Sequence, residues 1–157
     1  MELWPPATPL QLFAWCYALA LASALIPWLN SEVIVLSLSA FTPTLGGQLT
    51  LALAATVGQM TGKSTLYCAG RRLVKFPWAS RAGGSWCQKL AGRKWGGMIA
   101  VVASSTLGIP PFYLVSVLAD SLGIGLRTFV AAGTCGRLLH YLALVFAPRL
   151  LWRLFHS

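Results

Sequence analysis

Residues 107–113 read LGIPPFY and lie in the middle of an apolar segment that runs from residue 98 to residue 124. Pro110 and Pro111 remove two backbone donors and Gly108 loosens the chain, so a straight helix through this point is not expected. Each arm of the segment has about ten residues and therefore spans about 15 Å, half of the hydrocarbon thickness of a bilayer. These lengths predict a re-entrant helical hairpin rather than a full crossing.

A second break of this kind interrupts the first apolar segment, residues 10–43, where residues 26–32 read IPWLNSE. Each broken segment is followed by an unbroken apolar segment, residues 48–70 and 128–147. The chain therefore reads as one unit, hairpin plus span, used twice with the second copy inverted, which is typical of transporters. We expect an all-α integral membrane protein: an inverted repeat of a re-entrant helical hairpin plus a transmembrane helix. A layout with four full crossings fits the charge distribution equally well.

Composition also favours a membrane protein forming a single multi-pass domain, residues 1–157. The chain is 57% hydrophobic and only 10% charged, whereas soluble domains carry about a quarter charged residues. Seven of its twelve cations fall in the linker 71–97: Arg71, Arg72, Lys75, Arg81, Lys89, Arg93 and Lys94. Such a cluster predicts a cytoplasmic linker, and its interleaved tryptophans suit an anionic membrane surface, so no nucleic-acid partner is expected.

Residues 58–64, GQMTGKS, are similar to a phosphate-binding loop, but the first glycine stands one position late and no strand precedes it. We therefore expect no nucleotide site. Gly58, Gly62 and Gly70 lie four and eight residues apart and predict close helix contact. Gln59 and Lys63 make the middle of this span polar, as in a cavity wall, although Lys63 could instead extend toward the basic face of the membrane.

Two acidic residues, Glu32 and Asp120, lie in apolar segments, where an ionised side chain is costly. Glu32 stands at the first break and is our candidate proton carrier; the alternative is that it caps the helix that follows. Asp120 is close in sequence to Arg127 and fits an interfacial acid with an ion partner. Arg137 falls in the middle of the last span and needs a carboxylate such as Glu32, or a phosphate, as its partner.

These features predict a polar site at which Glu32 and Arg137 handle transport and protons. The residues expected to line it are Asn30, Ser31, Gln59, Lys63, Arg71, Pro110, Pro111, His140 and Tyr141. No spacing assembles a nucleophile, a base and an orienting group, or a set of metal ligands. We therefore expect no enzyme activity, no cofactor and no metal. Membrane lipids, protons and further copies of the chain are the expected partners.

The motifs resemble the DedA family, also called VTT-domain or SNARE-associated Golgi proteins, in its short bacterial form. The stretches LIPWLNSEVIVLSLSA (residues 25–40), TVGQMTGKSTLYCAGRRL (residues 56–73) and FVAAGTCGRLLHYLAL (residues 129–144) carry the resemblance. It implies two facing re-entrant hairpins in the bacterial inner membrane and lipid transport or scrambling, sometimes dependent on the proton-motive force. Two departures exist. Asn30-Ser31 stands where members often have Pro-Gly, and the second break lacks the acid or arginine that many members carry. A membrane assembly factor that does not transport is the alternative function.

Overall fold

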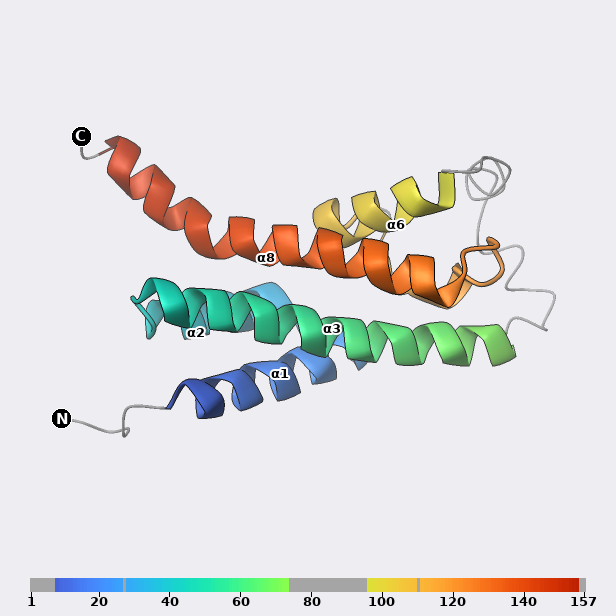
Figure 1. Ribbon diagram of the computed structural model, residues 1–157, viewed down its shortest axis with the longest axis horizontal. Helices are drawn as coiled ribbons and strands as arrows, with labels where there is room; N and C mark the ends of the chain where they lie inside the picture. The colour runs from blue at the N-terminus through green and yellow to red at the C-terminus, as the bar shows by residue number, and fades with distance from the viewer. Residues whose placement is uncertain (1–7, 27, 74–95, 110, 156–157) are drawn as a thin grey trace. The chain divides into compact units, whose positions relative to one another are not determined.

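The computed structural model describes residues 8–26, 28–73, 96–109 and 111–155, and within them all regular structure is helical. Six helices follow one another along these residues: α1 (Pro9–Leu25), α2 (Ser31–Ala40), α3 (Leu45–Leu73), α6 (Gly96–Leu107), α7 (Phe112–Leu118) and α8 (Leu126–Phe155). Figure 1 labels all of them except α7. The all-α prediction is therefore confirmed for this part of the chain. Most of the basic linker, residues 74–95, lies outside the described residues.

The first predicted break is present and has local causes. Helix α1 begins in a capping box, in which the Thr8 hydroxyl accepts from the Gln11 amide and the Gln11 side chain accepts from the Thr8 amide. It ends at Leu25, two residues before Pro27. Helix α2 restarts at Ser31 behind Asn30, whose side chain accepts from the Glu32 amide at 2.8 Å. The two helices pack against each other as a pair.

The second predicted break is also present. Helix α6 ends at Leu107, Gly108 adopts the left-handed conformation with φ of 73°, and α7 begins at Phe112 behind Pro111. The α6 and α7 helices pack against each other. The returning arm is shorter than predicted, because α7 ends at Leu118 and a turn through Gly123, with φ of 72°, leads into α8.

Both unbroken segments form single helices that extend beyond the predicted ranges 48–70 and 128–147. The sequence similar to a phosphate-binding loop lies inside α3, a continuous helix of 29 residues, so it forms no loop. Of the described helices, α8 alone contains a segment that is both long and apolar enough to cross a membrane, Leu126–Ala147. The α3 helix has sufficient length but more polar residues.

The chain forms two compact units, which are not the two sequence halves. Unit 1 contains α1, α2, α3 up to Gln59, and α8 from Tyr141 onward; unit 2 contains α3 from Met60, α6, α7, and α8 up to His140. The two long helices, of 29 and 30 residues, each contribute to both units, whereas each of the four shorter helices belongs to one unit. The hairpin-plus-span division predicted from the sequence therefore does not describe how the helices cluster.

Small residues bring the helices of unit 1 close together. Alanines dominate its core, together with Cys16, Val35, Leu51 and Tyr141. At Gly58, a Cβ atom would come within 2.5 Å of the Tyr17 carbonyl oxygen and 3.0 Å of the Ala20 methyl group. The close contact predicted for this glycine is therefore present, and it joins α3 to α1.

Unit 2 has a more aromatic core, in which the Phe129 ring packs against those of both Tyr67 and Phe112. The ring centroids of Phe112 and Phe129 are 5.7 Å apart, and those of Tyr67 and Phe129 are 5.3 Å apart. Gly70 lies so close to the Val117 backbone that α3 and α7 touch there without an intervening side chain. The close helix contact predicted for Gly70 is therefore present, and the contact predicted for Gly62 stays a prediction.

Both units also expose large apolar side chains. In unit 1, Trp28 is 94% exposed and Phe41 is 85% exposed; in unit 2, Ile109 is 78% exposed. The unit 1 half of α3 presents Leu45, Leu49, Leu53 and Val57, which recur every fourth residue on one exposed face. Apolar surface of this extent is unusual for a soluble monomer.

Candidate anion-binding site

Two aromatic residues open α7 directly after the second break. Phe112 is 3% exposed and belongs to the core of unit 2, where its ring lies against Phe129. Tyr113 is half-buried. Since the break ends at Pro111, which occupies the N-cap position, the local chain geometry holds these rings at the start of the returning arm.

Lys63 extends from α3 to these rings. Its side-chain nitrogen lies 5.1 Å from the ring centroid of Tyr113 and 6.0 Å from that of Phe112, within the range of cation–π attraction. The residue is only 5% exposed. Lys63 is therefore buried inside its unit and does not extend into an exposed position, and its predicted place in a cavity wall stays a prediction.

Arg137 reaches the same aromatic residue from α8. Its guanidinium carbon lies 5.1 Å from the Phe112 ring centroid. One turn earlier on α8, Gly133 provides the space for this arrangement, because a Cβ atom there would lie 2.8 Å from the Met60 methyl and 3.2 Å from the Phe112 ring. The missing side chain allows α8 to approach α7 closely enough for Arg137 to cover the ring.

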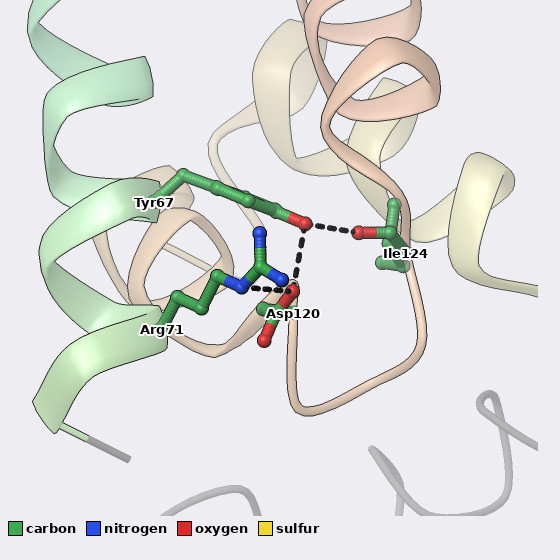
Figure 2. A network of polar contacts seen from close by, with 4 residues as sticks. All are labelled: Tyr67, Arg71, Asp120 and Ile124. Carbon is green, nitrogen blue, oxygen red and sulfur yellow. Dashed lines mark hydrogen bonds and ion pairs between the residues drawn. The ribbon is translucent and has the colours of Figure 1, made fainter.

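Lys63 and Arg137, with the rings of Phe112 and Tyr113, form a cationic cluster whose electrostatics favour an anion. Lys63 and Arg137 place two positive charges around one ring, and like charges repel strongly where little water screens them. Asp120 is the one acidic residue in the sequence of unit 2. Its carboxylate lies 3.8 Å from Arg71 Nε and 3.1 Å from the Tyr67 hydroxyl (Figure 2). Two cations that share one ring in this way can hold an anion between them.

Polar contacts fix the end of α6 beside the cluster. The His140 Nδ1 atom donates to the Thr106 carbonyl oxygen at 2.7 Å, and the Thr106 hydroxyl donates to the Gly136 carbonyl at 3.4 Å. At Gly136, a Cβ atom would collide with the Ser105 hydroxyl, so α6 also touches α8 directly. His140 thus orients the second break from the helix that carries Arg137.

The polar residues of the first break form a separate group in unit 1. Tyr141 is fully buried and donates its hydroxyl to Ser31 Oγ at 2.8 Å. Asn30 supplies the N-cap of α2, and Glu32, half-buried, lies in the first turn, where a negative charge is favourable. Asn30 therefore occupies the N-cap position, and Glu32 has the place near the helix N-terminus that the capping interpretation gave it. The predicted pair of Glu32 and Arg137 stays a prediction.

Gln59 has a structural contact rather than a place in the cationic cluster. Its side-chain amide donates to the Ala20 carbonyl at 3.2 Å and to Ser23 Oγ at 2.6 Å, both on α1. The residue is 2% exposed and belongs to unit 1. The side chain of Gln59 thus holds α3 against α1 directly beside the close contact of Gly58 with the same helix.

The three remaining predicted lining residues are Arg71, Pro110 and Pro111. Arg71 is on the same face of α3 as Lys63 but two turns further, about 12 Å along the axis. Its side chain is 71% exposed and pairs with Asp120, so the ion partner of Asp120 is Arg71 and not Arg127. Pro110 lies outside the described residues, and Pro111 is exposed.

The described residues contain no group of three or more histidine, cysteine or acidic side chains with metal-ligand geometry.

The sequence interpretation missed the aromatic half of the site. From the sequence, Phe112 and Tyr113 were only the last residues of the uncharged second break, and no role was predicted for Tyr67. The available signal was their position: two aromatic residues directly after a double proline, at the point where a half-length helix restarts. Cationic side chains of other helices, here Lys63 and Arg137, can then lie close to these two rings.

Comparisons of the chain with protein-family models, with curated proteins and with solved structures give no match.

Proposed function

We propose that this chain is a multi-pass membrane protein of the DedA type that binds a lipid by its phosphate-bearing head group and moves it across the bacterial inner membrane. The observation that carries the proposal is the convergence of Lys63 and Arg137 on Phe112. The chemistry is binding and transfer, without a bond made or broken. The resemblance in residues 25–40, 56–73 and 129–144 supports the same function.

Phosphate is the anion that suits these two side chains best. Arginine offers parallel N–H donors that match two phosphate oxygens, while lysine adds a compact charge that adapts to the third. Phe112 and Tyr113 give the cluster apolar walls, which strengthen charge interactions by keeping water out. A lipid combines such a head group with acyl chains that suit the exposed Ile109 and Leu107 at the same break.

Several features support a membrane location. The segment Leu126–Ala147 of α8 has the length and composition of a span. Three of the four helices beside the breaks are short, with 10 residues in α2, 12 in α6 and 7 in α7, which fits re-entrant arms, whereas α1 is longer with 17 residues. The inverted repeat of a hairpin plus a span remains part of this proposal, with the basic linker on the cytoplasmic side.

A lipid-movement assay tests the function. The full chain is reconstituted in phosphatidylcholine vesicles that contain a small share of fluorescent phosphatidic acid, and a membrane-impermeant quencher reports the outer-leaflet fraction over time. We expect the protein to accelerate exchange of phosphatidic acid between leaflets more than exchange of labelled phosphatidylcholine. Exchange rates equal to those of protein-free vesicles for both lipids would contradict the proposal.

The alternative, an assembly factor that holds partner proteins through glycines of α3, has less support from the contacts. Gly58 packs on α1 and Gly70 packs on α7, so both are used within the chain. A stoichiometric membrane protein that copurifies with the chain, combined with no lipid exchange, would favour the alternative.

A proton role for Glu32 is a separate part of the proposal. If Glu32 takes up and releases the coupling proton, Glu32→Gln should abolish the pH dependence of lipid exchange in the vesicle assay. If Glu32 also neutralises Arg137, the Glu32→Gln and Arg137→Gln substitutions should each lower detergent stability. The loss of stability in the double variant should then be smaller than the sum of the losses in the two single variants. Additive losses would exclude the pair, and unchanged pH dependence would exclude the proton role.

A further inference from the structure

Tyr113 adds a hydroxyl group to the cationic cluster of Lys63 and Arg137. The Lys63 side-chain nitrogen lies 5.1 Å from the centroid of the Tyr113 ring, and Tyr113 is half-buried, so part of it stays open to a ligand. In the part of the chain that the structure describes, this hydroxyl has no hydrogen-bond partner. Since a phenol donates one hydrogen, the cluster has an unused donor beside its lysine.

Other hydroxyl groups of unit 2 are already used within the fold. The Tyr67 hydroxyl donates to the Ile124 carbonyl oxygen at 2.8 Å. Ser116, on the same helix as Tyr113, donates to the Phe112 carbonyl oxygen at 2.6 Å. Neither hydroxyl can turn to a ligand without breaking a hydrogen bond of the fold. Tyr113 is different, because a new hydrogen bond from its hydroxyl breaks none of the described contacts.

The hydroxyl of Tyr113 and the two positive charges are close enough to act on one anion. The Lys63 ammonium lies over the ring that carries the hydroxyl, so a few ångströms separate the two groups. Arg137 lies 5.1 Å from the neighbouring Phe112 ring, and its charge is close enough to Lys63 to repel it. A single phosphate group, whose oxygens point in different directions, can therefore contact all three side chains.

Three donors and two positive charges match one class of phosphate better than the other. A phosphate monoester, the head group of phosphatidic acid, has three acceptor oxygens and a charge between about −1.5 and −2 at pH 7. A phosphodiester, as in phosphatidylglycerol, has one free oxygen fewer and a single negative charge. Arginine matches two oxygens with its parallel donors, and lysine adds a compact charge. Only a monoester then keeps an oxygen for the phenol.

We infer that the cluster selects a phosphate monoester over a phosphodiester, and that the Tyr113 hydroxyl makes the contact that separates them. The inference rests on the anion site of the proposed function and narrows its ligand. Lys63 and Arg137 attract both classes of lipid by their charge, so their removal weakens both. Loss of the Tyr113 hydroxyl alone weakens the monoester.

Native mass spectrometry of the full chain, titrated separately with phosphatidic acid and phosphatidylglycerol, tests the inference. Wild-type protein should bind phosphatidic acid about tenfold more tightly. Tyr113→Phe keeps the ring beneath Lys63 and lacks only the hydroxyl. It should weaken phosphatidic acid binding about tenfold, as expected for a hydrogen bond to a charged group, and change phosphatidylglycerol binding less than about twofold.

Tyr17→Phe is the matched control, because it removes the same hydroxyl from a half-buried ring of unit 1 that stacks on Phe13. It should leave the binding of both lipids unchanged. Glycerol 3-phosphate, a monoester without acyl chains, should displace phosphatidic acid only in large excess. Displacement at equal concentration would identify a soluble ester as the ligand and contradict lipid transfer, while still supporting monoester selectivity.

The inference and the proposed function fail in different ways. Wild-type binding that is equal for the two lipids, or a Tyr113→Phe variant that loses both equally or loses neither, would overturn the inference while lipid binding stands. A wild-type chain that forms no adduct with either lipid would contradict the proposed function and the inference together.

Discussion

Replacing Lys63 by methionine is expected to slow the exchange of phosphatidic acid between leaflets by about 10- to 100-fold. A hydrogen bond to a charged group contributes about 1.5 to 3 kcal/mol, and each 1.4 kcal/mol corresponds to a factor of ten. Methionine keeps a long flexible side chain against Phe112 and Tyr113, so the packing of unit 2 should change little. The rate is measured by the vesicle assay with equal amounts of reconstituted protein.

Two control substitutions separate the local charge from general electrostatics. Lys63→Arg keeps a positive charge at the rings and should retain most of the activity, whereas Arg72→Met removes a cation from an exposed position at the end of α3 and should change the rate less than about twofold. If Lys63→Met and Arg72→Met slow exchange equally, Lys63 has no specific role in binding the head group.

Replacing Gly70 by alanine should cause the largest loss of stability of any single methyl group added to α3. The new Cβ atom would overlap the Val117 carbonyl, and the neighbouring contacts are also backbone atoms, which cannot move aside as a flexible side chain can. Overpacked sites typically cost 1 to 3 kcal/mol, and we expect a loss of about 3 kcal/mol here. Thermal unfolding in detergent, followed by circular dichroism, measures the change.

Gly46→Ala is the matched control, because it adds the same methyl group to the same helix. No atom lies within 4 Å of the position that the Cβ atom of residue 46 would occupy. The substitution should therefore leave the unfolding midpoint unchanged or raise it slightly, since alanine favours a helix over glycine by up to about 1 kcal/mol. Equal midpoints for the Gly70→Ala and Gly46→Ala variants would contradict the close contact of α3 with α7.

The helix breaks could be predicted from the sequence because their causes are local. Pro27, Pro110 and Pro111 are residues that do not continue a helix, and they mark both breaks. Asn30 is a strong N-cap residue, so α1 ends and α2 begins close to the positions predicted from the sequence. The close contacts of Gly58 and Gly70 were also expected from the small-residue spacing, but the spacing did not indicate that the two glycines contact different helices, α1 and α7. Gly123 was the local signal that we missed, and it shortens the returning arm.

The composition of the units and the candidate site depend on tertiary contacts, which the sequence pattern does not contain. Hydrophobic periodicity does not indicate that α3 contributes to two compact units, or that α7 and α8 bring Phe112 and Arg137 together. Asp120 shows the same difficulty. Arg127 is its nearest cation in the following sequence, yet the structure pairs it with Arg71, 49 residues earlier, because the α7–α8 connection packs on the end of α3.

Binding of a phosphate-bearing lipid to the Lys63 and Arg137 cluster is the central claim, and native mass spectrometry of the full chain released from detergent tests it most directly. Wild-type protein is compared with the Lys63→Met/Arg137→Leu variant at equal concentrations of phosphatidic acid, with phosphatidylcholine and excess inorganic phosphate as separate competitors. We predict a phosphatidic acid adduct on the wild type that phosphatidylcholine does not displace and that the double variant lacks. An adduct of equal abundance on both folded proteins would contradict the account.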